Sequence, residues 1–152
     1  MVMISLHQAT LADLDDLVGL VENYRAFYKQ APNAGTRSYL ASRLADNEAI
    51  VFIATYNDDF NNSPAGFTMI YPTFSTVSLS HIWLLNDLFV EEKYRGHGIA
   101  TQLMDTAEQA ARDAGATRLF LRTAHDNTPA QALYEARGWK QDEVFRRYDL
   151  IF

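Results

Sequence analysis

The sequence contains no cysteine among its 152 residues. Disulfide bonds, thiolate zinc sites and a cysteine nucleophile are therefore excluded. No apolar stretch approaches the ~20 residues that a membrane-spanning helix needs, and the N-terminal segment MVMISLHQ has no basic region before a hydrophobic run. We therefore expect a cytoplasmic protein without a membrane partner.

Basic residues are also scarce, with 13 Lys and Arg against 19 Asp and Glu and a net charge of −6. Because binding to a nucleic-acid backbone depends on clustered Lys and Arg, nucleic acid is not expected as a partner, whereas a small cationic substrate would be attracted. The four histidines, His7, His81, His97 and His125, lack ligand spacing such as HExxH. No metal site is expected.

The composition that remains is that of an ordinary globular protein, with 48% apolar and 21% charged residues. The length suits one compact domain covering residues 1–152. Apolar periodicity predicts strands over residues 1–8, 49–55, 65–71, 82–90, 117–123 and 144–151. Helices are predicted after Thr10, which forms a capping-box pattern with Asp13, after Thr36, from Ile99, and after Thr128. The order βααββ followed by βαβαβ predicts a mixed α/β fold with local parallel pairing.

The segment LNDLFVEEKYRGHGIATQLM runs from a predicted strand through Gly96 and Gly98 directly into a helix. Glycines allow backbone amides to approach a ligand, a helix N-terminus favours phosphate, and Arg95 adds a charged fork. A P-loop is excluded because no GK[ST] follows, and Thr101 occupies the third glycine position of a dinucleotide fingerprint. Spacing alone supports a coenzyme A pyrophosphate site and a ligand-free turn about equally.

The residues RGHGIA match the pattern RxxGxA at Arg95, Gly98 and Ala100. This segment resembles the acetyl-CoA signature of the GNAT superfamily of N-acyltransferases. From Leu85 to Trp139 the whole order is similar to that superfamily, including RLFLRT and NTPAQALYEARGW. The resemblance implies a strongly twisted, mixed sheet of six to seven strands with about four helices, and the LND strand resembles the polyamine and histone-tail branch.

The resemblance also implies acetyl-CoA as cosubstrate. Backbone amides of the glycine turn and the following helix would hold its pyrophosphate: Arg95, Gly96, His97, Gly98, Ile99 and Ala100. The pantetheine arm would lie along Leu88, Phe89 and Val90, and Asn127 would bind the cofactor beside the catalytic helix. Relatives are often dimers, so a homodimer is possible.

Acetyl transfer to an amine requires a neutral nitrogen, a polarised thioester and a proton for the departing thiolate. The resemblance makes Tyr134 the candidate acid. Without the resemblance, the favoured interpretation of Tyr134 would be one of eight tyrosines, packing a helix face. Relatives that acetylate diamines carry a Glu–Asp pair where this chain has Asn86 and Asp87, and Asn86 cannot act as a base. The base is then Asp87, or water held by Asn86 with Glu91 or Glu92, and both Asn86 and Asp87 are candidates for substrate binding.

These residues predict an N-acetyltransferase that acts on a primary amine of a small cationic substrate, such as a polyamine or amino acid, or on a lysine side chain. Two alternatives stay open: a non-catalytic acyl-CoA-binding module and a nicotinamide-dependent reductase. Aromatic residues that fit either an acceptor pocket or the core are Tyr24, Phe27, Tyr28 and Trp83.

Overall fold

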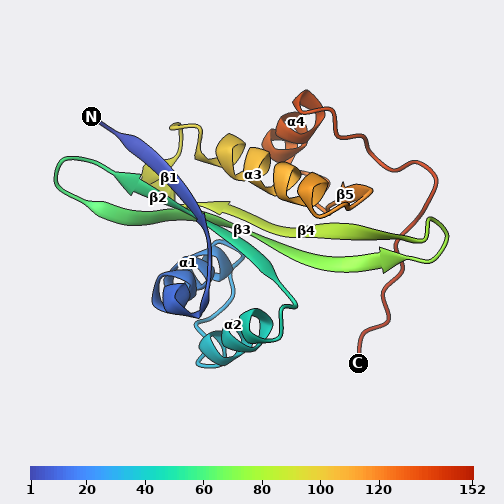
Figure 1. The fold of residues 1–152 in the computed structure, drawn as a ribbon, viewed down its shortest axis with the longest axis horizontal. Coiled ribbons are helices and arrows are strands. Elements are labelled where there is room, and N and C mark those ends of the chain that lie inside the picture. Colours follow the sequence, from blue (N-terminus) through green and yellow to red (C-terminus); the bar gives the residue numbers. More distant parts are fainter. The chain divides into compact units, whose positions relative to one another are not determined.

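The computed structural model describes residues 1–152, which divide into two compact units, Met1–Leu121 and Arg122–Phe152. The first unit contains a five-stranded sheet in the order β1-β2-β3-β4-β5 (Figure 1). Its strands are β1 (Met3–Gln8), β2 (Ile50–Asn57), β3 (Asn62–Ser75), β4 (Ser80–Val90) and β5 (Arg118–Phe120). Neighbouring strands from β1 to β4 are antiparallel, and β5 pairs with β4 in parallel. The predicted crossover from β4 to a parallel strand is confirmed.

Helices cover both faces of this sheet. Helices α1 (Leu14–Phe27) and α2 (Thr36–Ala45) lie on one face, and α3 (Ile99–Asp113) lies on the other (Figure 1). Short 3-10 turns at Leu11–Asp13 and Glu92–Tyr94 precede α1 and α3. The predicted capping box is confirmed, since the Thr10 amide donates to Asp13 Oδ2 at 2.8 Å and the Thr10 hydroxyl accepts from Ala12. No helix in the structure has both the length and the apolar composition to span a bilayer.

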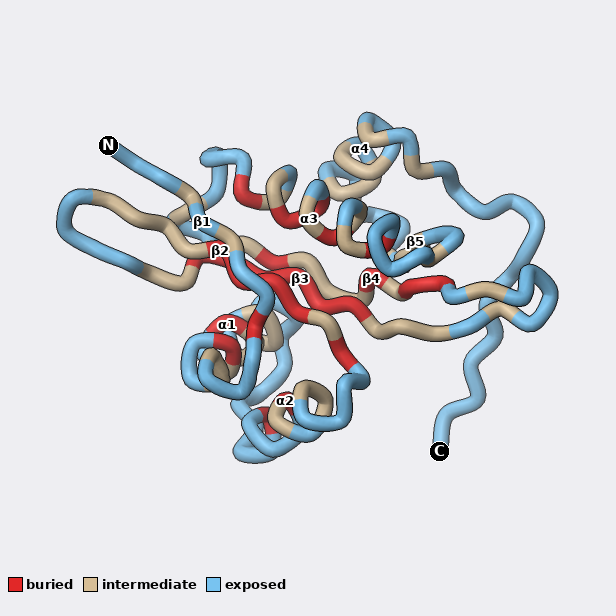
Figure 2. Tube along the Cα trace, viewed as in Figure 1, coloured by how far each residue is buried: buried red, intermediate tan, exposed pale blue.

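The hydrophobic core follows the middle strands (Figure 2). Between the sheet and the first two helices lie Leu17, Leu20, Leu40, Val51, Ile53, Phe67, Met69 and Phe89. Helix α3 buries Ile99, Leu103, Met104, Ala107 and Ala111. Each fully buried large side chain stabilises the fold by about 1.5–3 kcal/mol, so the central strands form a rigid support for any site built on β4.

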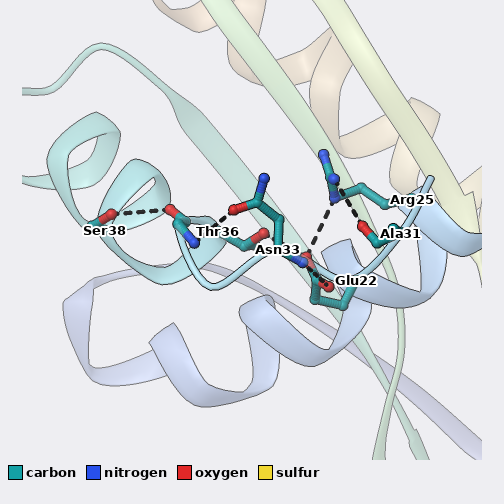
Figure 3. Close-up of polar contacts among 7 residues, drawn as sticks. Glu22, Arg25, Ala31, Asn33, Thr36 and Ser38 are labelled. Carbon is teal, nitrogen blue, oxygen red and sulfur yellow. Dashed lines mark hydrogen bonds and ion pairs between the residues drawn. The ribbon is translucent and has the colours of Figure 1, made fainter.

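The connection between α1 and α2 is held by a polar cluster (Figure 3). The Glu22 carboxylate accepts hydrogen bonds from the Asn33 amide, at 3.2 Å, and from the Thr36 hydroxyl. Arg25 forms an ion pair with Glu22 at 3.3 Å and donates to the Ala31 carbonyl at 3.1 Å. This cluster fixes the loop that follows the C-terminal end of α1.

The expectation of six to seven strands is wrong, because the sheet has five. The segment 144–151, predicted as a strand, belongs to no strand, and Val144, Tyr148 and Leu150 are exposed. Its first two backbone amides, of Val144 and Phe145, both donate to the nearby side-chain oxygen Asp142 Oδ1. Alternating apolar residues indicate a strand only where the backbone finds a ladder partner, and here a local turn takes the first donors.

Candidate functional site

Strand β4 carries an irregularity at the predicted Asn86–Asp87 pair. Met69 of β3 lies opposite Asp87, whereas the next residue, Ile70, lies opposite Leu85, so Asn86 is an extra residue in β4. Such a bulge bends a strand and redirects its side chains, and bulges are frequent beside active sites. The bulge thus gives Asn86 and Asp87 orientations that a regular ladder would not provide.

The edge of β4 that faces β5 is only partly paired. The parallel ladder covers Ile82–Leu84 and Arg118–Phe120 and ends there. From Leu85 to Val90 no strand of the first unit pairs with this edge. Apart from the carbonyls of Asp87 and Val90, which accept side-chain hydrogen bonds, backbone groups that face away from β3 on this stretch have no strand partner and can pair with an extended ligand, in the manner of strand addition. Leu88, Phe89 and Val90 lie on this stretch.

Asp87 is the chemically unusual group on β4. Burial raises the pKa of its carboxyl above the ordinary range, while hydrogen bonds from Asn86 Nδ2, at 2.9 Å, and from Tyr24 lower the pKa and only partly offset burial. Burial, and then the charge of Asp87, raises the pKa of the Tyr24 hydroxyl well above its usual range. The Asp87 carboxylate is therefore a better proton acceptor than an ordinary aspartate, and Tyr24 stays neutral beside it.

The backbone of Asp87 is also anchored. The hydroxyl of Thr68, a fully buried residue of β3, donates to the Asp87 carbonyl oxygen at 2.9 Å. A buried hydroxyl needs a partner, and this carbonyl supplies it. Thr68 therefore links the core of the sheet to the residue next to the bulge.

The four aromatic residues that the sequence offered for either an acceptor pocket or the core separate into two groups. Tyr24 packs against Phe67 and Phe89, each with ring centroids 5.6 Å away, and Trp83 is buried. Phe27 and Tyr28, at the end of α1, are 59% and 51% exposed. Of the four aromatic candidates, Tyr24 and Trp83 thus contribute to packing, while Phe27 and Tyr28 present ring surface to solvent.

The glycine turn leads from β4 into α3. Gly96 and Gly98 have φ angles of 81° and 75°, a region that glycine enters without strain, and Gly98 is the N-cap of α3 with no side-chain cap. The backbone amides from Gly96 to Thr101 donate to no protein acceptor, and a Cβ added at either glycine would meet no atom within 4 Å. Consecutive free amides around an uncapped helix N-terminus fit a phosphate group. The Arg95 amide, in contrast, donates to Glu92 O at 3.2 Å.

Aromatic and polar contacts hold this turn in place. Tyr94 stacks on Tyr56 at 4.7 Å between centroids, and the His97 ring meets the Tyr56 ring edge-on at 5.2 Å. His97 Nδ1 lies 3.1 Å from the carbonyl oxygens of Tyr94 and Arg95, so this nitrogen carries the proton. Arg95 Nε donates to Val90 O at 3.0 Å, which ties the turn to the end of β4.

The second unit contains α4 (Thr128–Ala136). Asn127 is its N-cap, and Asn127 Oδ1 accepts from the Ala130 amide at 3.4 Å. At the other end the Trp139 amide donates to Tyr134 O and the Gly138 amide to Glu135 O, each at 3.0 Å, which is a Schellman motif. The rings of Tyr134 and Trp139 lie 6.0 Å apart, the side-chain contact that commonly accompanies this motif. Local structure therefore fixes where Tyr134 lies on α4.

The candidate residues of the first unit lie on one continuous stretch of β4, a 3-10 turn and the start of α3. Asn86 to Val90 end β4, Glu92–Tyr94 form the turn, and Arg95 to Ala100 lead into α3. Asn127 and Tyr134 belong to the second unit. Sequence reasoning did not identify Gly66, Thr68 or Tyr56. A glycine inside a strand pattern can signal a close backbone approach, which would have pointed to Gly66. The others depend on strand register and carry no local signal.

Comparison with known proteins gives consistent results. Residues 17–139 match the model of the Acetyltransferase (GNAT) family. The chain is 39% identical over 147 residues to the uncharacterized N-acetyltransferase YhfO of Bacillus subtilis, with 96% of each chain covered. It is 25% identical over 127 residues to a D-amino-acid N-acetyltransferase of Saccharomyces cerevisiae, covering 82% of this chain and 78% of that protein.

Solved structures share the fold. A probable acetyltransferase superposes with a TM-score of 0.89 at 36% identity, covering 97% of both chains. An aminoglycoside N-acetyltransferase in complex with CoA superposes with a TM-score of 0.79 at 18% identity, covering 99% of this chain and 96% of that chain, a likeness of fold alone.

Proposed function

This chain belongs to the acetyltransferase (GNAT) family, and we propose that it acetylates the primary amine of a small cationic acceptor, such as a polyamine or an amino acid, or a lysine side chain. Acetyl transfer of the GNAT type is the activity of the family; the acceptor class is the proposal. The observation that carries it is the half-buried Asp87 carboxylate at the bulge of β4, the strand that precedes the glycine turn with its free amides. Acetyl-CoA supplies an activated thioester when bound.

The cosubstrate fits the residues present. We assign its pyrophosphate to the turn from Arg95 to Ala100, where the amides of Gly96, His97 and Gly98 have no protein acceptor. Its pantetheine arm would lie along Leu88, Phe89 and Val90, where the β4 edge is unpaired. Asn127, already a helix cap, keeps its amide nitrogen for the cofactor role that the family resemblance implies.

Asp87 is the proposed general base. A base must be deprotonated at working pH yet basic enough to accept a proton from an alkylammonium, and a raised carboxyl pKa moves Asp87 in that direction. The carboxylate also attracts a cationic acceptor, and Asn86 beside it can donate or accept a hydrogen bond. Names of relatives support an amine acceptor: one is the D-amino-acid N-acetyltransferase described above, and another is a thialysine N-epsilon-acetyltransferase of Bos taurus, 33% identical over 73 residues, 48% of this chain.

Tyr134 is the proposed acid that protonates the departing thiolate. A phenol is a weaker acid than a thiol by roughly 1.5 pKa units, so the site must favour proton transfer to sulfur by a hydrogen bond. Tyr134→Phe should bind acetyl-CoA normally and lose most acetylation, while Tyr148→Phe, on an exposed side chain, should change neither. Unchanged turnover in Tyr134→Phe would remove Tyr134 from the mechanism.

The acceptor can be identified by measuring release of the coenzyme A thiol from acetyl-CoA with a panel of amines. The panel holds polyamines, amino acids of both hands, aminoglycosides and a histone-tail peptide, and each is also assayed with Asp87→Asn, which lacks the proposed base. Thiol release with any cationic amine, lost in Asp87→Asn, supports the proposal. Turnover that is equal in Asp87→Asn, or silence across the panel, would contradict it.

The family match over residues 17–139 crosses the boundary between the two units, which supports the proposal of a single domain over residues 1–152. We also expect a homodimer, which gel filtration would detect, and a cytoplasmic location, which cell fractionation would test.

A further inference from the structure

An aromatic residue of β2 packs against the glycine turn. Tyr56 stacks on Tyr94, with the ring centroids 4.7 Å apart and the ring planes at 24°. The His97 ring meets the same tyrosine edge-on, with the centroids 5.2 Å apart and the planes at 85°. One ring from β2 therefore contacts the turn at two points, ahead of Gly96 and between Gly96 and Gly98.

The sheet directs Tyr56 toward this turn. Phe52 and Ala54 precede it at alternate positions of β2, and both are buried outside the cluster that packs beneath α1 and α2. Alternate residues of a strand share a face of the sheet, so Tyr56 lies on the face that α3 covers (Figure 1). The glycine turn leads into α3 on that same face.

A bulge in β3 supports this contact. The pairing of β2 with β3 shifts between Ala54 and Thr55, which leaves Ala65 as an extra residue of β3. The Ala65 carbonyl accepts a hydrogen bond at 2.8 Å from the amide of Glu91, the residue that follows β4. The bulge therefore ties the point where the chain leaves β4 to the part of the sheet that carries Tyr56.

His97 is the link between Tyr56 and the free amides. Gly96 and Gly98 flank His97, both at positive φ, and a glycine backbone has many conformations open to it. The His97 side chain is therefore the group that can fix the turn between the two glycines. Its Nδ1 lies 3.1 Å from two backbone carbonyl oxygens of the turn, and its ring is held by Tyr56. Fixing a binding loop in advance lowers the entropy that ligand binding costs.

We propose that Tyr56 is a positioning residue for acetyl-CoA. Through its contacts with Tyr94 and His97, it holds the free amides of the turn in the arrangement that receives the pyrophosphate. Tyr56 takes no part in the chemical step, so it contributes to the affinity for the cosubstrate and not to kcat. This role of Tyr56 rests on the proposed function, because the turn must hold the pyrophosphate, but not on which amine accepts the acetyl group.

The first test measures acetyl-CoA binding to the full chain by calorimetry. Tyr56→Leu removes both ring contacts and should bind acetyl-CoA about tenfold more weakly than the wild type, because the turn then becomes ordered only when the ligand binds. Tyr56→Phe should bind like the wild type, since the ring makes both contacts. Tyr39→Leu is the matched control: it replaces a half-exposed tyrosine of α2, on the opposite face of the sheet, and should leave the affinity unchanged.

A second measurement separates positioning from a general loosening of the fold. S-acetylpantetheine carries the thioester and the pantetheine arm but no pyrophosphate. With an amine that the wild type acetylates, kcat/KM of Tyr56→Leu should fall about tenfold for acetyl-CoA and stay unchanged for S-acetylpantetheine, and kcat at saturating acetyl-CoA should stay unchanged. If urea titrations show that Tyr56→Leu does not fold, His97→Ala tests the same link on an exposed side chain and should show the same selective loss.

Three results would overturn the role of Tyr56. They are wild-type affinity for acetyl-CoA in a folded Tyr56→Leu or in His97→Ala, binding to Tyr56→Phe as weak as binding to Tyr56→Leu, and equal losses with the two thioesters. No binding of acetyl-CoA to the wild type would instead refute the proposed function, and the role of Tyr56 with it.

Discussion

Gly66 of β3 lies unusually close to the backbone of β4. A Cβ built at Gly66 would lie 2.5 Å from the carbonyl oxygen of Phe89 and 3.3 Å from the Cα of Val90. Both neighbours are backbone atoms, so no side-chain rotation can relieve the contact. Gly66→Ala therefore requires β3 and β4 to move apart at the residues proposed to line the pantetheine arm.

The cost of that movement follows from general values. Forcing an extra methyl group into a packed interior costs about 1–3 kcal/mol, and replacing glycine by alanine returns about 0.4–1 kcal/mol by restricting the unfolded chain. We expect Gly66→Ala to lower the free energy of unfolding by about 1–2 kcal/mol in urea titrations. Calorimetry should also show weaker binding of acetyl-CoA, because Phe89 and Val90 are displaced.

Gly19→Ala is the matched control. Gly19 lies inside α1, and a Cβ there would meet nothing within 4 Å. Alanine should stabilise this helix by up to about 1 kcal/mol and leave acetyl-CoA binding unchanged. If Gly66→Ala proved as stable as Gly19→Ala, the close approach of the two strands at Phe89 would be wrong.

Three further variants test the site. Asp87→Asn should be more stable than the wild type at pH 7, because a carboxyl whose folded pKa is raised stabilises the fold only when protonated. In pH-dependent urea titrations the difference should shrink as pH falls through the raised pKa of folded Asp87 and should stop changing below the ordinary aspartate pKa of 3.8; a constant difference would contradict the raised pKa. Gly98→Ala and Gly115→Ala both place alanine at positive φ, so each should lower the free energy of unfolding by about 1–2 kcal/mol. Only Gly98→Ala should weaken acetyl-CoA binding in calorimetry. Equal affinities of the two variants would exclude the turn as the phosphate site. Thr68→Val keeps the side-chain shape and removes the hydroxyl that donates to the Asp87 carbonyl oxygen. It should lower the free energy of unfolding by about 1 kcal/mol and shift the acidic limb of the pH profile of kcat/KM. An unchanged profile would show that Thr68 does not position Asp87.

Features determined by neighbouring residues could be predicted from the sequence. The Thr10–Asp13 capping box and the start of α3 directly after Gly98 depend on residues within a few positions of each other. Strand β4 was also predicted closely, over 82–90 against the observed Ser80–Val90, because its apolar run is bounded by clear turn residues. These local signals were enough to locate both the glycine turn and Asp87.

Features that depend on strand register could not be predicted. The bulge at Asn86 exists only relative to Met69 and Ile70, which lie sixteen or more positions earlier in the chain. The same is true of the hydrogen bond from the Thr68 hydroxyl to the Asp87 carbonyl oxygen, which joins two neighbouring strands. The wrong prediction of a strand at 144–151 has a related cause. Alternation of apolar and polar residues indicates which side chains would share a face, but it does not indicate whether a partner strand is present.

The direction of the pKa shift distinguishes Asp87 from carboxylates that serve the fold. Hydrogen bonds from the Thr10 backbone lower the pKa of Asp13, and the Thr36 hydroxyl lowers that of Glu22, as expected for a helix cap and a loop clamp that stabilise the charged form. Burial dominates at Asp87 and raises its pKa, so its charge costs the fold stability at neutral pH. A carboxylate that lowers stability at neutral pH, on a bulge beside an unpaired strand edge, fits the proposed role of Asp87 in proton transfer better than a role in packing.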